Sequence, residues 1–316
     1  MIPAGVVVVT YNSSGVIGDC LDSCASLPIV VVDNASSDGT LDVIGSRANV
    51  RLIANSRNRG FAAAVNQGVA SLDADLILLL NPDVELRTSI DALIEACRSP
   101  ETGIAAGKLV DASGRAQAGF NVRRFPQPAT LAFEALGWNR LWRGNPVNRR
   151  YRCLDLDPEQ QAEVEQPAGA FLMFRRDVWE RLKGFDERFH PLWFEDVDFC
   201  KRAKDLGVRI RYVPEVVACH VGGHSVAGLN SGCRELYWYA SLLRYASKHF
   251  RSIGYRGVSG AVALGSVLRA VAGVFQLRSL KPIAVHARVV RLALLCMFSG
   301  RVRKPGGWAG YSKAVG

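Results

Sequence analysis

Residues 6–10 read VVVVT and residues 29–32 read IVVV, and these two short apolar runs decide the class of fold. Two further runs, VRLIA at 50–54 and LILLL at 76–80, follow along the chain. All four are bounded by turn residues and are too short for helices, so they predict strands. Nearly continuous Val, Ile and Leu is typical of strands that are buried on both faces of a parallel sheet.

The segments between these strands favour helices, which we place at 15–26, 40–47, 60–71 and 88–97. Later segments predict a strand at 170–174, a helix at 176–183, a helix that starts near 195, and a strand at 210–213 that continues at 216–219. This alternation predicts an α/β fold with a doubly wound, mostly parallel sheet of the kind that binds nucleotides. The segment 112–165 interrupts it with four prolines, and from residue 115 to 152 it has eight Arg against one acid, Glu134. We expect it to be an irregular excursion over the active face.

Charge is distributed unevenly along the 316 residues, whose formal net charge is +10. Residues 236–316 hold 13 of the 39 basic side chains and no Asp or Glu. Residues 1–235 hold the other 26 basic side chains and all 29 acidic side chains, so their net charge is −3. We therefore expect two domains, an acidic body at 1–235 and a basic helical tail at 236–316 whose partner is anionic, either nucleic acid or a membrane surface.

The eight cysteines are scattered and form no C-x-x-C pair, which is typical of buried thiols in a reducing compartment. The N-terminus leads directly into a strand without a basic segment, so we expect no signal peptide and a cytoplasmic protein.

Polar residues follow the predicted strands, where an open α/β sheet places its ligand. Thr10, Tyr11 and Asn12 end the first strand, and Asp33 ends the second. Asp33 could accept hydrogen bonds from a nucleobase or a ribose, although the residues after it, NASSDGT, also form turns and helix caps. Residues 58–61 read NRGF at the start of a helix, where Arg59 and Gly60 would allow a phosphate to approach, a weak signal by itself.

Two carboxylate-bearing motifs suggest chemistry. The run LLLNPDV delivers Asn81 and Asp83 to the end of a strand, where two side-chain oxygens and a diphosphate would suffice for Mg²⁺ or Mn²⁺; a simple N-P-D turn is the alternative. In LWFEDVDFC at 192–200, Glu195, Asp196 and Asp198 lie among aromatic residues, which should raise at least one pKa and suit a general base. Acids at a helix N-terminus are the alternative for Glu195.

A Gly-rich segment, CHVGGHS at 219–225, follows the last strand. Its two histidines, His220 and His224, are as consistent with a metal or diphosphate contact as with a structural role.

In order along the chain, these motifs resemble those of the inverting family 2 glycosyltransferases of GT-A fold, and within them the bacterial rhamnosyltransferase branch. The motifs are VVVTYN, VVDNASSDGT, NRGFAAAVNQG, LNPDV, GAFLM, GFDERF, FEDVDF and HVGGHS, spread over roughly residues 5–230. The resemblance implies a nucleotide-sugar donor, a divalent cation, Mg²⁺ or Mn²⁺, and a single displacement at the anomeric carbon.

The resemblance also assigns roles to residues. Asp196 matches the catalytic base, with Glu195 beside it, and Asp83 and His220 match the metal side. The donor would contact Thr10, Tyr11, Asn12, Asp33, Arg59, Gly60, Asn81 and Gly169, while Trp193 and Asp198 would lie on the acceptor side. Two positions depart from the family pattern. Asn81 replaces the first Asp of its D-x-D motif, as is usual in the rhamnosyl branch, and Val65 replaces an Arg that many members carry.

We therefore expect transfer of L-rhamnose from dTDP-β-L-rhamnose to a polyprenyl-diphosphate-linked or polysaccharide acceptor. A sugar nucleotidyltransferase is one alternative, which would leave a nucleoside monophosphate on its acceptor. A non-catalytic nucleic-acid-binding protein is another, but the basic residues of the tail lie among Val, Leu and Ala instead of aromatics. The segment 282–299 is amphipathic, and neither it nor 257–277 has the ~20 uninterrupted apolar residues of a spanning helix. We expect this pair to lie on the cytoplasmic face of the membrane; packing against the body is the alternative.

Overall fold

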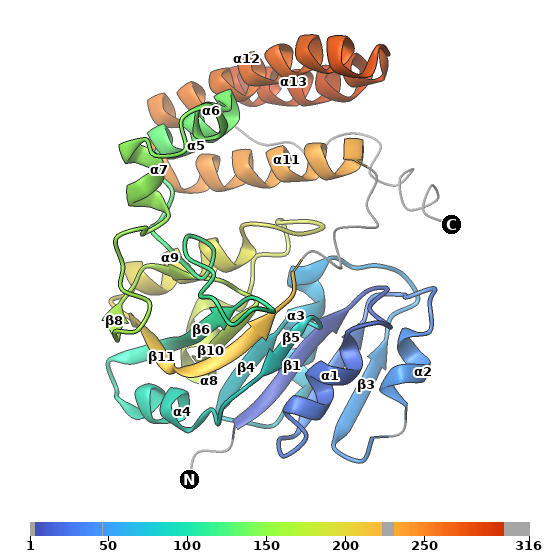
Figure 1. Ribbon diagram of the computed structural model, residues 1–316, viewed down its shortest axis with the longest axis vertical. Coiled ribbons are helices and arrows are strands. Elements are labelled where there is room, and N and C mark those ends of the chain that lie inside the picture. Colours follow the sequence, from blue (N-terminus) through green and yellow to red (C-terminus); the bar gives the residue numbers. More distant parts are fainter. Residues whose placement is uncertain (1–3, 46, 223–230, 300–316) are drawn as a thin grey trace. The chain divides into compact units, whose positions relative to one another are not determined.

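A computed structural model describes residues 4–45, 47–222 and 231–299. The chain forms two compact units (Figure 1). The first takes in the chain up to Phe125, then Arg152–Pro191, and continues from Glu195 through the last strand; the second contains Pro126–Tyr151, Leu192–Phe194 and the helices after residue 230. The second unit therefore includes segments that lie well before residue 236, where the sequence predicts the start of the tail.

A nine-stranded sheet organises the first unit (Figure 1). Its order is β3-β2-β1-β4-β10-β6-β11-β5, with β8 paired to β11. Six strands run in one direction, and β5, β8 and β10 run against them. The strands are β1 (Ala4–Thr10), β2 (Ile29–Asp33), β3 (Val50–Ala54), β4 (Leu76–Leu80), β5 (Val84–Leu86), β6 (Thr102–Val110), β8 (Ala162–Glu163), β10 (Phe171–Arg175) and β11 (Arg209–His220). The predicted mostly parallel α/β sheet is confirmed.

Helices cover this sheet close to where the sequence predicts them. They are α1 (Ile17–Ser23), α2 (Thr40–Ile44), α3 (Phe61–Ser71), α4 (Asp91–Arg98), α8 (Arg176–Leu182) and α9 (Glu195–Asp205). A separate two-stranded ribbon pairs β7 (Val122–Arg123) with β9 (Gln166–Pro167). The long strand β6 is absent from the sequence prediction, because the small residues of TGIAAGKLV, two of them glycine, interrupt its apolar run.

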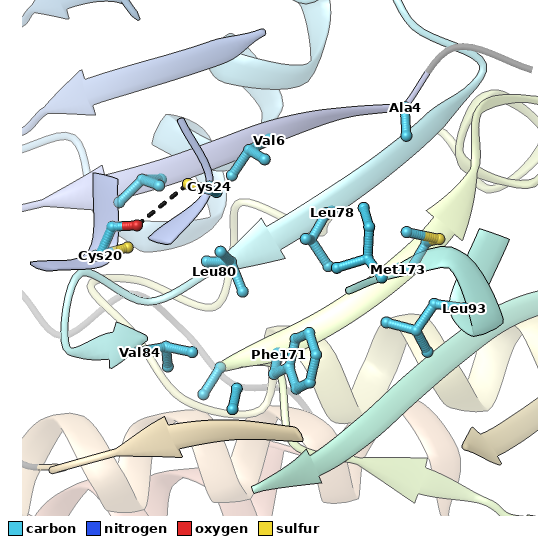
Figure 2. Close-up of a cluster of buried hydrophobic side chains, with 14 of the residues drawn as sticks. Ala4, Val6, Cys20, Cys24, Leu78, Leu80, Val84, Leu93, Phe171 and Met173 are labelled. Atoms are coloured by element: carbon cyan, nitrogen blue, oxygen red, sulfur yellow. Dashed lines mark hydrogen bonds between the residues drawn. The ribbon is translucent and has the colours of Figure 1, made fainter. Parts of the chain in front are cut away.

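The core of the first unit lies between the sheet and its helices, and Figure 2 shows part of it. Leu78 and Leu80 on β4 pack with Phe171 and Met173 on the antiparallel neighbour β10, and all four are at most 1% exposed. Phe171 also explains Gly107 in the middle of β6, since a Cβ there would lie 2.3 Å from its ring. This packing fixes β10 between β4 and β6, so the start of β10 lies beside the ends of the parallel strands.

The second unit is helical. Its helices are α5 (Pro128–Leu136), α6 (Trp138–Leu141), α7 (Pro146–Tyr151), α11 (Ser231–His249), α12 (Ser252–Leu277) and α13 (Lys281–Ser299). The prediction of an irregular excursion at 112–165 is wrong for 128–151, where a proline stands at the start of both α5 and α7. Proline is tolerated in the first turn of a helix because the N–H that it lacks has no helical partner there.

Two helices of the second unit are long and apolar enough to cross a membrane by length and composition. They are Ser252–Gln276, with a mean hydropathy of 1.7, and Lys281–Ser299, with 1.5. The statement that neither stretch could span is therefore too strict. All eight cysteines are free, and six of them are buried, as expected for reduced thiols.

Candidate active site

The predicted site residues gather along one edge of the sheet, which we call the carboxyl edge. The parallel strands end there, and the antiparallel β10 begins there. The backbone N–H of Asn81 donates to the carbonyl of Ala170 over 2.9 Å and ties the end of β4 to the start of β10. Residues that end or follow the strands β1, β2, β4 and β11, or precede β10, are Thr10, Asp33, Asn81, Asp83, His220 and Gly169.

Asp196 lies in the first turn of α9, and two backbone N–H groups hold its carboxylate. Gly169 donates to Oδ2 over 2.9 Å, and Val197 donates to Oδ1 over 2.8 Å. Burial raises the pKa of Asp196, while these two N–H groups and the positive charge of Arg123 offset part of the rise. A carboxylate of raised pKa is a stronger base than an ordinary Asp and is suited to accept a proton in a general-base step.

The two neighbouring carboxylates are less accessible than Asp196, which is partly exposed. Asp198 has no exposed side-chain surface, and its Oδ2 accepts a hydrogen bond from Arg202 Nε over 2.7 Å. The same guanidinium donates to the carbonyls of Leu182 and Gly184. Through these bonds Asp198 anchors α9 to the end of α8, and its place on the acceptor side stays a prediction. Glu195 is 5% exposed, and its role beside the base stays a prediction.

Strained backbone immediately precedes α9. Trp193 has φ +77 and Phe194 φ +72, in a region that non-glycine residues rarely adopt and that costs about 1–3 kcal/mol per residue. In the second unit, Trp193 contacts Trp238 edge to face, with ring centroids 5.6 Å apart. Phe194 packs on Trp238 and Tyr245. These contacts offset the strain, and the place of Trp193 on the acceptor side stays a prediction.

Gly169 has a physical reason to be glycine. A Cβ at this position would lie 2.8 Å from Cβ and 2.9 Å from Oδ2 of Asp196. Gly169→Ala should therefore push the carboxylate aside and lower the rate of transfer by about 10²-fold, as misplacement of a reacting group by about 1 Å does. The control is Gly144→Ala, because a Cβ there meets nothing within 4 Å. Comparison of initial rates tests this prediction. A fully active Gly169→Ala would show that transfer does not require the observed position of the Asp196 carboxylate.

A second pair of side chains, Asp83 and His220, lies on the loop after β4 and at the end of β11. His220 Nε2 is 3.5 Å from Asp83 Oδ1, and both side chains are less than 10% exposed. Asp83 Oδ1 is buried and receives no hydrogen bond. Burial lowers the pKa of His220, and the charge of Asp83 opposes this.

Gln117 sets the orientation of the His220 ring. Its Oε1 lies 3.1 Å from His220 Nδ1, and its Nε2 donates to the His220 carbonyl over 2.6 Å. A hydrogen bond to Gln117 Oε1 requires the ring proton on Nδ1, and Nε2 faces the Asp83 carboxylate. An imidazole nitrogen 3.5 Å from a buried carboxylate oxygen that accepts no hydrogen bond fits a cation. No group of three His, Cys, Asp or Glu side chains suited to a metal occurs among the described residues, so a cation would take its other ligands from water and from a diphosphate.

Sequence reasoning missed three residues beside this pair. Phe120 stacks on the His220 ring with centroids 5.1 Å apart, and the Arg123 guanidinium lies over Phe120 at 5.5 Å from the centroid. Gln117 is the third. The arginine cluster at 115–152 was the only sequence signal for this segment. His224 lies outside the described residues, so its role stays a prediction.

At the ends of β1 and β2, Thr10 and Asp33 differ in the free hydrogen-bonding capacity of their side chains. Thr10 Oγ1 is buried and has no hydrogen-bond partner. Both oxygens of Asp33 accept hydrogen bonds from Ser36, as the turn alternative predicts, although carboxylate oxygens have capacity for more. Asn12, with φ +50, links the two loops by accepting a hydrogen bond from the Ser37 N–H over 2.8 Å. The donor contacts of these residues and of Tyr11 stay predictions.

The N-terminus of α3 is occupied by protein. The N–H of Phe61 donates to the Pro191 carbonyl over 2.7 Å, and a Cβ on Gly60 would lie 2.6 Å from His190 Nδ1. The absence of a side chain at Gly60 therefore makes room for His190 and Pro191, which lie in the segment before α9. Arg59 is exposed and contacts Gln67, so it can reach a ligand; Val65 is fully buried in the core.

Comparison with known proteins places this geometry in context. The family model for Glycosyl transferase family 2 matches residues 5–182. The N-acetylglucosaminyl-diphospho-decaprenol L-rhamnosyltransferase of Mycobacterium tuberculosis is 31% identical over 239 residues, which cover 70% of this chain and 76% of that protein. The rhamnosyltransferase WbbL of Escherichia coli is 28% identical over 170 residues, covering 53% of this chain and 60% of that protein.

Solved structures share the fold. Mannosyltransferase PcManGT from Pyrobaculum calidifontis, in complex with GDP-Man and Mn²⁺, aligns with a TM-score of 0.52 at 17% identity and covers 99% of this chain and 85% of its own. GalNAc-T7 with UDP, GalNAc and Mn²⁺ aligns with a TM-score of 0.54 at 14% identity. The alignment covers 79% of this chain and 51% of the GalNAc-T7 chain. The predicted GT-A fold is confirmed.

Proposed function

Because the chain belongs to glycosyl transferase family 2, we propose that it moves a sugar from a nucleoside diphosphate donor to an acceptor hydroxyl with inversion at the anomeric carbon. One observation carries this proposal. Asp196, the most exposed acid of its cluster, is fixed by Gly169 at the same edge of the sheet as the Asp83–His220 pair. The proposal therefore assigns the base and the site for the charged leaving group to one edge of the sheet.

The reaction proposed is a single displacement. Asp196 Oδ accepts the proton of the acceptor hydroxyl while the acceptor oxygen forms its bond to the anomeric carbon. The bond from that carbon to the diphosphate breaks, and the leaving nucleoside diphosphate takes the electron pair. A divalent cation, Mg²⁺ or Mn²⁺, would stabilise that negative charge when bound. Asp83 and His220 would hold it, and Thr10, Asp33 and Asn81 would orient the donor.

For the donor we propose dTDP-β-L-rhamnose, which is supported by the rhamnosyltransferase relatives and by Asn81 in the N-P-D variant of the metal motif. The test measures nucleotide release from dTDP-rhamnose and from UDP and GDP sugars, with Mg²⁺ or Mn²⁺. We expect release from dTDP-β-L-rhamnose and an α-linked product by NMR. A β-linked product would contradict inversion, and turnover of another donor alone would overturn only the choice of sugar. Nucleoside monophosphate on the acceptor would identify a nucleotidyltransferase.

For the acceptor we propose a glycan carried on a polyprenyl diphosphate, or a polysaccharide, at the cytoplasmic face of the cell membrane. The name of the mycobacterial relative contains such a lipid, and residues 236–316 of this chain, which hold no Asp or Glu, supply positive charge for an anionic surface. Nucleic acid is not proposed as a partner, since the basic residues of α12 and α13 lie among aliphatic side chains.

A further inference from the structure

The α12–α13 pair exposes a large apolar surface. The two helices pack side by side, α12 also packs on α5, and α13 also packs on α11 (Figure 1). Even so, among the described residues 11 of the 19 exposed large hydrophobic side chains lie between Ile253 and Phe298. Phe275 is 79% exposed and Phe298 76%. Such a surface on a soluble body marks a site that is covered by a partner or by lipid.

A groove of about 600 Å³ runs between the two helices. Its walls follow the helical repeat, with one row of side chains from each helix. The wall of α12 contains Val267, Ala270, Val271, Val274 and Phe275, and the wall of α13 contains Ile283, Ala287 and Val290. We call this the hairpin groove.

Two buried polar groups and one arginine interrupt the apolar lining. Ser266 is fully buried and His286 is 9% exposed, and neither Ser266 Oγ nor His286 Nδ1 has a hydrogen-bond partner. Arg291, which is exposed, also lines the groove. An apolar slot with a cation beside it fits an amphiphile that has a hydrocarbon chain and an anionic head group.

We propose that the hairpin groove binds a hydrocarbon chain of an anionic membrane lipid, with the lipid phosphate at Arg291. Charge selects this occupant. Residues 236–316 hold 13 basic side chains and no acid, so a second copy of the tail would be repelled, whereas an anionic bilayer contributes about 1 kcal/mol for each Lys or Arg near its surface. Exposed cations at Arg278, Lys281, Arg288 and Arg291 lie on or beside α13, which borders the groove.

The packing of α12 favours a helix that lies in the membrane interface. Arg269, near its middle, donates to the carbonyls of Glu134 and Ala135 on α5, and Gly265 lets the Ala135 carbonyl approach. One side of α12 therefore contacts protein, and the groove on its α13 side remains for lipid. This site is independent of the chemistry at the carboxyl edge.

The test uses the full chain and vesicles of phosphatidylcholine, with and without phosphatidylglycerol, that carry a phospholipid with a diazirine in its acyl chain. After photolysis, mass spectrometry locates the labelled residues. We expect flotation only with phosphatidylglycerol, and labels within 266–275 and 283–291. Ala287→Phe, which fills the groove, should lower labelling there about tenfold, the effect of displacing about two buried methylene groups, while flotation persists.

Ala284→Phe is the matched control, because Ala284 is exposed on α13 and does not line the groove. Arg291→Glu should weaken flotation on anionic vesicles and leave the fold intact, as circular dichroism would show. Absence of flotation, labels confined to other segments, or equal labelling in wild type and Ala287→Phe would overturn the proposal. So would a dimer in solution that Ala287→Phe dissociates. No nucleotide sugar is present, so failure here leaves the transferase proposal untouched.

Discussion

Asp196→Asn should lower the rate of sugar transfer by about 10²–10⁴-fold, because the amide keeps the shape of the carboxylate and cannot accept the acceptor proton. The amide oxygen can still accept the hydrogen bond from the Gly169 N–H, and only the bond from the Val197 N–H to the other oxygen is lost, so the fold should be retained. Initial rates at saturating donor measure the loss, and donor affinity from calorimetry should be nearly that of the wild type. Asp205→Asn, at the other end of α9 and exposed, is the control.

The pH dependence gives a second readout for the same residue. Burial raises the pKa of Asp196, so the carboxylate is protonated and inactive over a wider acidic range than an exposed Asp. The transfer rate should therefore fall as pH falls through this raised pKa, with a midpoint above that of an ordinary Asp. The residual rate of Asp196→Asn should lack this acidic limb. Near-normal turnover of the variant would move the base to Glu195.

Much of the fold could be predicted because the strands that form its centre are also its most apolar segments. The runs at 6–10, 29–32, 50–54 and 76–80 are all strands in the structure. β6 was missed because its packing against Phe171 requires Gly107, and a glycine reduces the strand signal. The reversed direction of β10 could not be predicted either, since a short apolar run does not indicate which way its neighbours point.

For the candidate site, the sequence predicts which residues lie at the ends of strands. It does not predict which of their side chains are accessible or which residues hold them. The motif EDVD does not show which carboxylate is accessible, because the answer depends on how α9 is rotated. Arg202 pairs with Asp198 from one turn further along α9. Asp196 is held by Gly169, which lies 27 residues earlier in the chain. Phe120 and Gln117 reach His220 from about a hundred residues away, and no local pattern reports such contacts.

The division of the chain could not be read from charge alone. Residues 128–136 belong with the second unit because α5 packs against α12, a contact between segments more than a hundred residues apart. Composition located the start of the acid-free tail near residue 236, but packing draws Pro126–Tyr151 and Leu192–Phe194 into the same unit. Removal of the tail would expose α5, so tests of its role need the full chain.

Removal of the divalent cation, or of the carboxylate that would hold it, should abolish transfer. Asp83→Asn keeps the volume of the side chain and removes the charge that faces His220 Nε2 at 3.5 Å. Loss of several kcal/mol of stabilisation of the leaving diphosphate corresponds to a rate decrease of about 10³-fold. The variant should also bind Mn²⁺ and the donor more weakly in calorimetry, and wild type in excess chelator should recover its activity when Mg²⁺ or Mn²⁺ is added back.

Asp73→Asn provides the matched control for this experiment, since Asp73 is exposed and precedes β4 at the strand end opposite to Asp83. It should retain the activity and metal affinity of the wild type. Full activity of the wild type in excess chelator would contradict the need for a cation and would leave neutralisation of the diphosphate to arginines of the 115–152 segment. Arg123 would then be the first to replace, because its charge already reaches Asp196 and its guanidinium lies over Phe120, which stacks on His220.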